Sequence, residues 1–108
     1  MEVLYANEHS VYAGSKTGFI HKINGDNVGA TATIADSTIL DLSGTNETLY
    51  ALTHRKEIHE LDANSLEVRR SHTVSYNATC MTFVAGTGEL WVGDSTGKIF
   101  VLDASSFD

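Results

Sequence analysis

The stretch GELWVGDSTGKIFVLDASS, residues 88–106, decides how the rest of the chain is interpreted. Apolar and polar residues alternate on both sides of an Asp-Ser-Thr-Gly turn at 94–97. Two short alternating runs joined by such a turn predict an antiparallel hairpin, since successive side chains of a strand point to opposite faces. The apolar residues recur at period two rather than 3.6, which argues against a helix.

The same pattern occurs twice more upstream. Residues 79–106 match residues 38–65 without a gap, and residues 10–24 match residues 48–62. The matched positions include Trp91 with Tyr50 and Tyr12, Ile99 with Ile58 and Ile20, Leu102 with Leu61 and Ile23, Met81 with Leu40, and Phe83 with Leu42. Three copies in phase, at a period of about 40 residues, predict a repeat protein whose unit is a four-stranded β-propeller blade.

The expected blades divide the chain into three ranges. Blade one covers 1–36, blade two 37–76 and blade three 77–108. We expect strands at 3–6, 11–14, 19–23 and 28–34 in blade one, at 39–43, 49–53, 58–62 and 66–72 in blade two, and a last strand at 99–103 in blade three, which lacks its outer strand. The predicted fold class is all-β, with about three four-stranded antiparallel blades.

Three blades make an incomplete ring, because closed propellers contain roughly four to eight. An open arc exposes two apolar faces and a strand edge, and such surfaces favour association. Two arrangements are compatible with the sequence. Either the chain is part of a larger propeller, which its end within blade three favours slightly, or copies of the chain or partner chains supply the remaining blades.

The hairpin ELWVGDSTGKIFVLD (89–103) resembles the second and third strands of a WD40 repeat. In that family the turn reads Asp, two small residues and Gly, and the following strand ends in Trp-Asp. Here Asp94 and Gly97 bound the turn, and Leu102-Asp103 stands where Trp-Asp is expected. The Trp and the usual Gly-His are missing from every copy, which weakens the expectation of the family's His–Asp hydrogen-bond network. Structural turn roles are predicted for Asp94, Gly97, Asp62 and Asp103.

Composition excludes several partners. The net charge of −7 disfavours a phosphate backbone, so we expect no nucleic acid. No apolar run approaches the roughly 20 residues of a membrane helix, and the N-terminus lacks the pattern of a secretory signal. The single cysteine, Cys80, cannot form an internal disulfide, and its apolar strand predicts a buried, unreactive thiol. We therefore expect a cytoplasmic protein without membrane association.

Catalytic motifs are not recognisable in the sequence. It contains no G-x-S-x-G, P-loop or H-E-x-x-H pattern. His54 and His59 lie five residues apart, and His21 and His59 occupy matching positions, but packing or surface roles explain them more simply than a metal site. Asp94 and Asp103 could form a carboxylate pair, although turn capping is the simpler role. We expect neither enzymatic activity nor a cofactor or metal.

A basic cluster supplies the candidate binding site. HRKE (54–57) falls in the turn between the second and third strands of blade two, where the other copies have 16–19 and 95–98. In propellers this turn and the loop into the first strand form one rim. Candidate partner-binding residues on this rim are Lys16, His54, Arg55, Lys56, Tyr76, Asn77 and Asp94. A solvated turn is the simpler interpretation of the same cluster.

A narrower resemblance covers residues 74–103, VSYNATCMTFVAGTGELWVGDSTGKIFVLD. This segment looks like a blade in the second propeller of the actin-interacting protein 1 family, whose paired WD40 propellers help cofilin to disassemble actin filaments. The resemblance implies actin and cofilin as partners. The function that we expect is a non-enzymatic protein-interaction scaffold. The alternative is a self-assembling oligomeric propeller that binds a small ligand such as a glycan. A propeller hydrolase or lactonase, a third class, requires a metal bound in the channel.

Overall fold

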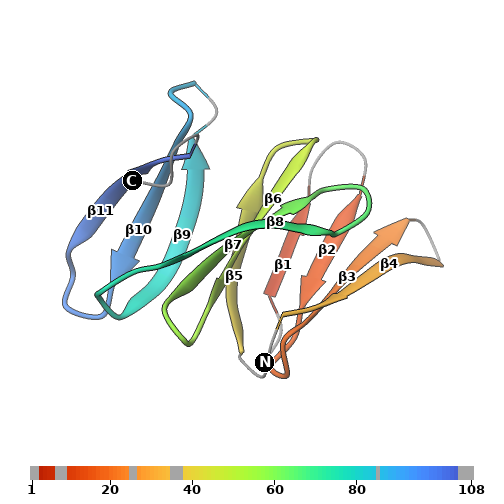
Figure 1. Cartoon of the computed structure of the whole chain (residues 1–108), viewed down its shortest axis with the longest axis horizontal. Coiled ribbons are helices and arrows are strands. Elements are labelled where there is room, and N and C mark those ends of the chain that lie inside the picture. Colours follow the sequence, from red (N-terminus) through yellow and green to blue (C-terminus); the bar gives the residue numbers. More distant parts are fainter. Residues whose placement is uncertain (1–2, 7–9, 25–26, 35–37, 85, 105–108) are drawn as a thin grey trace.

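The chain forms three antiparallel sheets that follow one another in sequence (Figure 1). The computed structural model describes residues 3–6, 10–24, 27–34, 38–84 and 86–104. All regular secondary structure in these ranges is β-strand, which confirms the predicted all-β class. The strands are β1 (Val3–Ala6), β2 (Val11–Gly14), β3 (Phe19–Asn24) and β4 (Asn27–Thr33); β5 (Ile39–Gly44), β6 (Thr48–Thr53), β7 (Glu57–Asp62) and β8 (Val68–Thr73); and β9 (Ala78–Val84), β10 (Glu89–Asp94) and β11 (Ile99–Asp103).

Within each sheet the strands pair in the order of the sequence, as in a propeller blade. The sheets stand side by side with β1, β5 and β9 adjacent (Figure 1). The hydroxyl of Tyr5 on β1 donates to the Gly44 carbonyl at the end of β5, at 2.7 Å. On the other side of β5, the Met81 N–H donates to Oδ2 of Asp41 at 2.8 Å. These bonds hold the three first strands together as the inner edge of the arc.

Two apolar clusters fill the spaces between the sheets. The first joins the first and second sheets and includes the fully buried side chains of Tyr12, Ile20 and Leu49. The second joins the second and third sheets and includes Ile58 and Leu90. Each blade therefore buries both faces only where it has a neighbour on both sides, and the second sheet alone meets this condition within the described residues.

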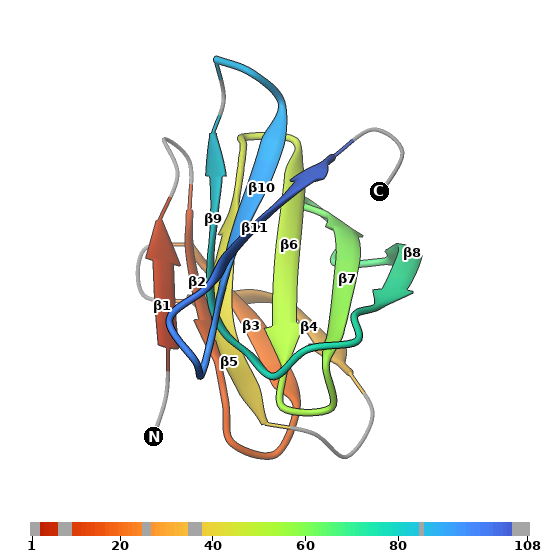
Figure 2. The same ribbon diagram turned by 90° about the vertical axis from the view of Figure 1, so that its left-hand side faces the viewer.

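The repeat positions show where the arc is open. Tyr12 and Ile20 face the second sheet and are 1% and 0% exposed. Their counterparts in the third sheet, Trp91 and Ile99, are 41% and 66% exposed. They lie on the outer face of the third sheet, which is turned to the viewer in Figure 2. The described residues thus form an open arc of propeller-like blades, as predicted.

The gap-free match is wrong in one strand. Leu42 pairs with Ala51 across the first two strands of the second sheet. In the third sheet Val92, which matches Ala51, pairs with Met81. Met81 therefore corresponds to Leu42 rather than to Leu40. The physical reason is a turn between β9 and β10 that is longer than the turn between β5 and β6. A bulge in the first strand does not contribute, because it lies between Ile39 and Asp41 in β5 and at the equivalent place, between Ala78 and Cys80, in β9.

Two further predictions are corrected by the structure. Cys80 is exposed, not buried. It lies directly opposite Gly93 on the outer face of the third sheet, where no described sheet covers it. The strand predicted to begin at Leu66 begins at Val68 instead, because Leu66 has a φ of 62° and belongs to the turn after β7.

Candidate partner-binding rim

Three turns on one side of the arc form the rim on which the sequence placed its candidates. They connect β2 to β3, β6 to β7, and β10 to β11. The His54 N–H donates to the Thr38 carbonyl at 2.9 Å, so the second turn is tied to the segment that enters β5. The Ser95 N–H donates to the Asn77 carbonyl at 3.0 Å and ties the third turn to the segment that enters β9. Backbone hydrogen bonds therefore tie these two rim turns to the segments that enter the first strands of their sheets.

One position in all three turns requires a left-handed backbone. Gly18 and Gly97 have φ values of 92° and 91°. Lys56 occupies the same place in the second turn with a φ of 65°. A residue with a Cβ atom is strained in this region, whereas glycine adopts it freely. The turn geometry is thus common to the repeats, while only the second repeat places a charged side chain there.

Asp94 acts within its own turn. Its Oδ1 accepts hydrogen bonds from the Thr96 N–H at 2.9 Å, the Thr96 hydroxyl at 2.8 Å and the Lys98 N–H at 2.9 Å. Desolvation acts to raise the pKa of Asp94, but these hydrogen bonds and the charge of Lys98 outweigh it and lower that pKa. The carboxylate therefore stabilises the turn that ends with the left-handed Gly97.

The rim carries most of the cations of an acidic chain. Of the seven Lys and Arg residues, the rim turns hold Lys16, Arg55, Lys56 and Lys98. The first three are exposed, and their side chains make no ion pair or hydrogen bond with the described residues. By contrast, the ammonium of Lys22 lies 3.3 Å from Oδ1 of Asn64, away from the rim turns. The free cations of the described structure are therefore concentrated on one surface.

A hollow of about 390 Å³ opens on this rim between the second and third sheets. Its walls come from β5, the turn before β7, the segment that enters β9, and the turn after β10. The lining residues are Leu40, His54, Lys56, Asn77, Ala78, Thr79 and Ser95. Since both sheets contribute, the hollow exists only after the blades have packed.

The structure unites three of the predicted candidates, His54, Lys56 and Asn77, in the hollow. Lys16 lies one turn away, and its carbonyl accepts the Thr38 hydroxyl at 2.9 Å. Arg55 is exposed beside them and does not line the hollow.

Tyr76 has a different environment from the other candidates. Its ring stacks on Phe100 with centroids 3.7 Å apart. Burial, followed by the charge of Asp94, raises the pKa of the Tyr76 hydroxyl. Tyr76 therefore contributes packing beneath the rim rather than an exposed contact.

Four lining residues were missed: Leu40, Ala78, Thr79 and Ser95. The sequence alone could have indicated Ser95, because Ser95 matches the candidate residue His54 in the repeat alignment. Leu40, Ala78 and Thr79 lie in or next to apolar strands and give no sign of their place until the sheets pack.

The opposite rim is held by internal ion pairs. Asp62 accepts hydrogen bonds from the Asn64 and Ser65 N–H groups at 2.8 and 3.1 Å, and these bonds lower the pKa of its carboxyl. Arg69 lies 3.0 Å from the same carboxylate. Arg70 bonds the carboxylate of Glu60 and reaches the Ala104 carbonyl of the third sheet at 2.7 Å. Arg70 therefore links the second and third sheets, whereas Arg69 pairs within the second sheet. Asp103 is exposed at the end of β11.

Two histidines make matching cross-strand contacts. Nδ1 of His21 lies 3.0 Å from the hydroxyl of Thr31, and Nδ1 of His59 lies 2.7 Å from the hydroxyl of Ser71. Both pairs join a third strand to the outer strand of its sheet.

Among the described residues there is no group of three or more metal-ligating side chains. The described residues also contain no helix long and apolar enough to cross a membrane.

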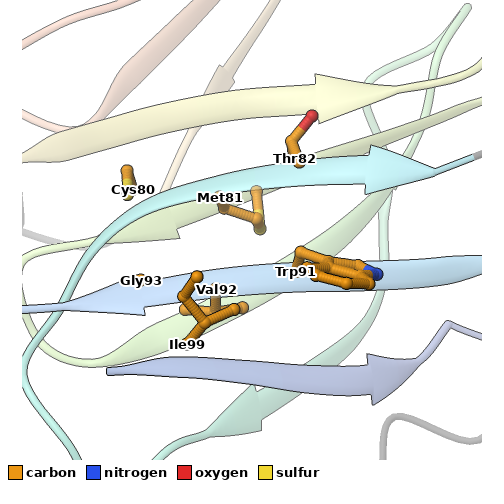
Figure 3. Close-up of a pocket in the computed structure, with 7 residues that line it drawn as sticks. All are labelled: Cys80, Met81, Thr82, Trp91, Val92, Gly93 and Ile99. Atoms are coloured by element: carbon orange, nitrogen blue, oxygen red, sulfur yellow. The ribbon is translucent and has the colours of Figure 1, made fainter. Parts of the chain in front are cut away.

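The outer face of the third sheet is apolar. A groove of about 370 Å³ crosses it, and Figure 3 shows the residues that line it, which include Cys80, Trp91 and Ile99. Val101, 45% exposed, extends the apolar surface along β11. On the far side of the arc, Leu4 is 72% exposed on β1. Both ends of the arc therefore present apolar sheet faces.

Comparison with known proteins supports the fold. Neither a protein-family model nor a curated protein matches the sequence. Among solved structures, the RRP9 WD40 repeats align with a TM-score of 0.87 and 14% identity over 98% of this chain and 36% of that one. Sqt1 from Saccharomyces cerevisiae aligns with a TM-score of 0.79 and 18% identity over 93% of this chain and 30% of that one. The β-propeller domain of Myceliophteria thermophila Swd1 gives 0.82 and 10%, over 95% and 35%.

At these identities the likeness establishes the fold. The chain has the blade fold of these WD40 propellers, and it spans about a third of the length of the three structures.

Proposed function

We propose that this chain is a section of a β-propeller that acts as a protein-interaction scaffold and binds its partner through the rim. The observation that carries the proposal is the set of exposed cations, Lys16, Arg55 and Lys56, without partners among the described residues. They stand on turns that backbone hydrogen bonds already hold in place. A preorganised surface loses little conformational entropy when a partner binds.

Site-specific photo-crosslinking tests the rim. A photo-reactive amino acid replaces Arg55 in the full chain, and the control replaces Asn64, which is exposed in the turn after β7. We expect discrete crosslinked polypeptides from position 55 that position 64 does not give. The same products from both positions, or none from position 55, would refute rim binding.

The remaining blades of the ring belong to the same proposal. Trp91 and Ile99 repeat the positions at which Tyr12 and Ile20 pack on a following sheet. We infer that further blades cover this face, either in a larger polypeptide or in other chains or copies. The greater length of the solved structures supports the larger polypeptide. Light scattering on a sizing column separates the cases, since a discrete multiple of 11.7 kDa indicates closure by copies.

Actin filaments with cofilin are the partner that we propose to test first, in the cytoplasm. The support is the resemblance of residues 74–103 to a blade of the actin-interacting protein 1 family. In a co-sedimentation assay, the complete protein should pellet with filaments and cofilin, and Arg55→Ser should reduce the pelleted fraction. No sedimentation above the filament-free control would exclude this partner. Saturable binding to particular sugars on a glycan array would favour the oligomeric ligand-binding alternative.

A further inference from the structure

The hollow between the second and third sheets contains donors that the described protein leaves unused. His54, Lys56, Asn77 and Ser95 line it, and their side chains form no hydrogen bond or ion pair with the described residues. Thr79 differs, since its hydroxyl donates to the Gly93 carbonyl at 3.3 Å. Four hydrogen-bonding side chains that converge from two sheets on one space define a polar site.

Two of the nearby acids are engaged in hydrogen bonds. The third, Glu57, has its Oε1 3.4 Å from Nε2 of His59, a contact that is an ion pair only when His59 is protonated. Asp94 is occupied by the three hydrogen bonds of its turn. Asp41, next to Leu40 on β5, accepts the N–H groups of Met81 and Leu42 at 2.8 and 2.9 Å. Lys56 therefore has no acidic partner in the described structure, and Lys16 and Arg55 add positive charge on the same rim.

We propose that this hollow binds the carboxylate of an acidic side chain in the partner protein. The inference rests on the proposed rim function and specifies what the rim recognises. An ionised carboxylate only accepts hydrogen bonds. A site that offers an ammonium, an amide, a hydroxyl and an imidazole can donate hydrogen bonds to both of its oxygens. Partial enclosure by two sheets reduces the screening of the charge compared with a flat surface.

The floor of the hollow adds a second requirement. Leu40 and Ala78 line it beside the polar groups. A peptide with an apolar residue next to its acidic residue fits both, because the apolar side chain covers Leu40 and Ala78 while the carboxylate meets Lys56. The preferred segment is therefore acidic and apolar in adjacent positions, rather than a uniformly charged run.

Fluorescence anisotropy of the full chain with a labelled peptide tests the proposal. The probe is a short peptide with adjacent Glu and Leu residues in a Gly-Ser background, and its control carries Gln in place of Glu. We expect saturable binding of the Glu probe, weakened by added salt, and little binding of the Gln probe. Lys56→Gln should weaken binding about fivefold to tenfold. Lys22→Gln, with the same charge change away from the rim turns, should leave it unchanged.

Asn77→Asp provides an independent variant, because it places a second carboxylate in the hollow and should weaken binding by at least the same factor. Equal binding of the Glu and Gln probes, or equal loss from Lys56→Gln and Lys22→Gln, would overturn the proposal. Binding of only a phosphoserine version of the probe, or equally good binding of single-stranded DNA, would overturn it as well. If the probe fails while crosslinking from position 55 persists, the acidic specificity is wrong and the rim function stands. If crosslinking also fails, both are wrong.

Discussion

The strongest quantitative prediction concerns the left-handed residue of the second rim turn. Lys56 has a φ of 65° where the other two turns have Gly18 and Gly97. This conformation costs a residue with a Cβ about 1–2 kcal/mol, and glycine loses about 0.5–1 kcal/mol more backbone entropy on folding. We therefore expect Lys56→Gly to stabilise the fold by about 0.5–1 kcal/mol, since the exposed side chain makes no hydrogen bond or ion pair that would be lost.

Thermal unfolding followed by circular dichroism measures the effect. For a domain of about this size the gain corresponds to a rise in Tm of about 2–8 °C. Lys56→Ala is the matched control, because it removes the same charge but retains the Cβ strain. Lys56→Asn should lie between the two, since asparagine tolerates this region better than alanine. A Tm for Lys56→Gly at or below that of Lys56→Ala would refute the turn geometry. Lys56→Gly should also lose affinity for the acidic probe, so stability and binding change in opposite directions.

Three further changes test the packing of the blades. Tyr12→Phe removes a buried hydroxyl that bonds a second-sheet carbonyl at 2.6 Å, and urea unfolding should show a loss of about 1–3 kcal/mol; an unchanged midpoint would contradict that bond. Burial raises the pKa of Asp41 above its ordinary 3.8, so ionisation costs the folded state stability as the pH rises through and above 3.8. The stability of Asp41→Asn relative to wild type should therefore increase over that range, and a flat or falling difference would argue against the desolvation. Ile58→Val should cost about 0.5–1.5 kcal/mol, whereas Ile99→Val should cost almost nothing in the isolated chain; equal costs would show that the Ile99 face is covered.

The sequence was sufficient for the blades because their signals are local. Alternation at period two and the Asp-to-Gly turn at 94–97 depend only on neighbouring residues. The same hairpin pattern also occurs in all three copies of the repeat, which strengthens the prediction of each one. For the same reason, the observed strands begin and end within about two residues of the predicted positions. The failure at Met81 arose where a turn changed length, because a longer turn shifts the pairing of the whole strand.

The site was predictable only in part. Turn positions placed His54, Lys56 and Asn77 on one rim, because in propellers the turns between the second and third strands share that rim with the loops into the first strands. Their convergence with Leu40 and Ser95 in one hollow depends on how the second sheet packs against the third.

What the chain's own sequence determined is the blade, and what only the tertiary structure decided is the relation between blades. The same repeat position is buried at Ile58 and 66% exposed at Ile99, although both stand in equivalent alternating strands. Alternation specifies which side chains share a face, but burial depends on whether another sheet covers that face. For the same reason the exposure of Cys80 and the hollow beside Lys56 became visible only when the sheets were placed together.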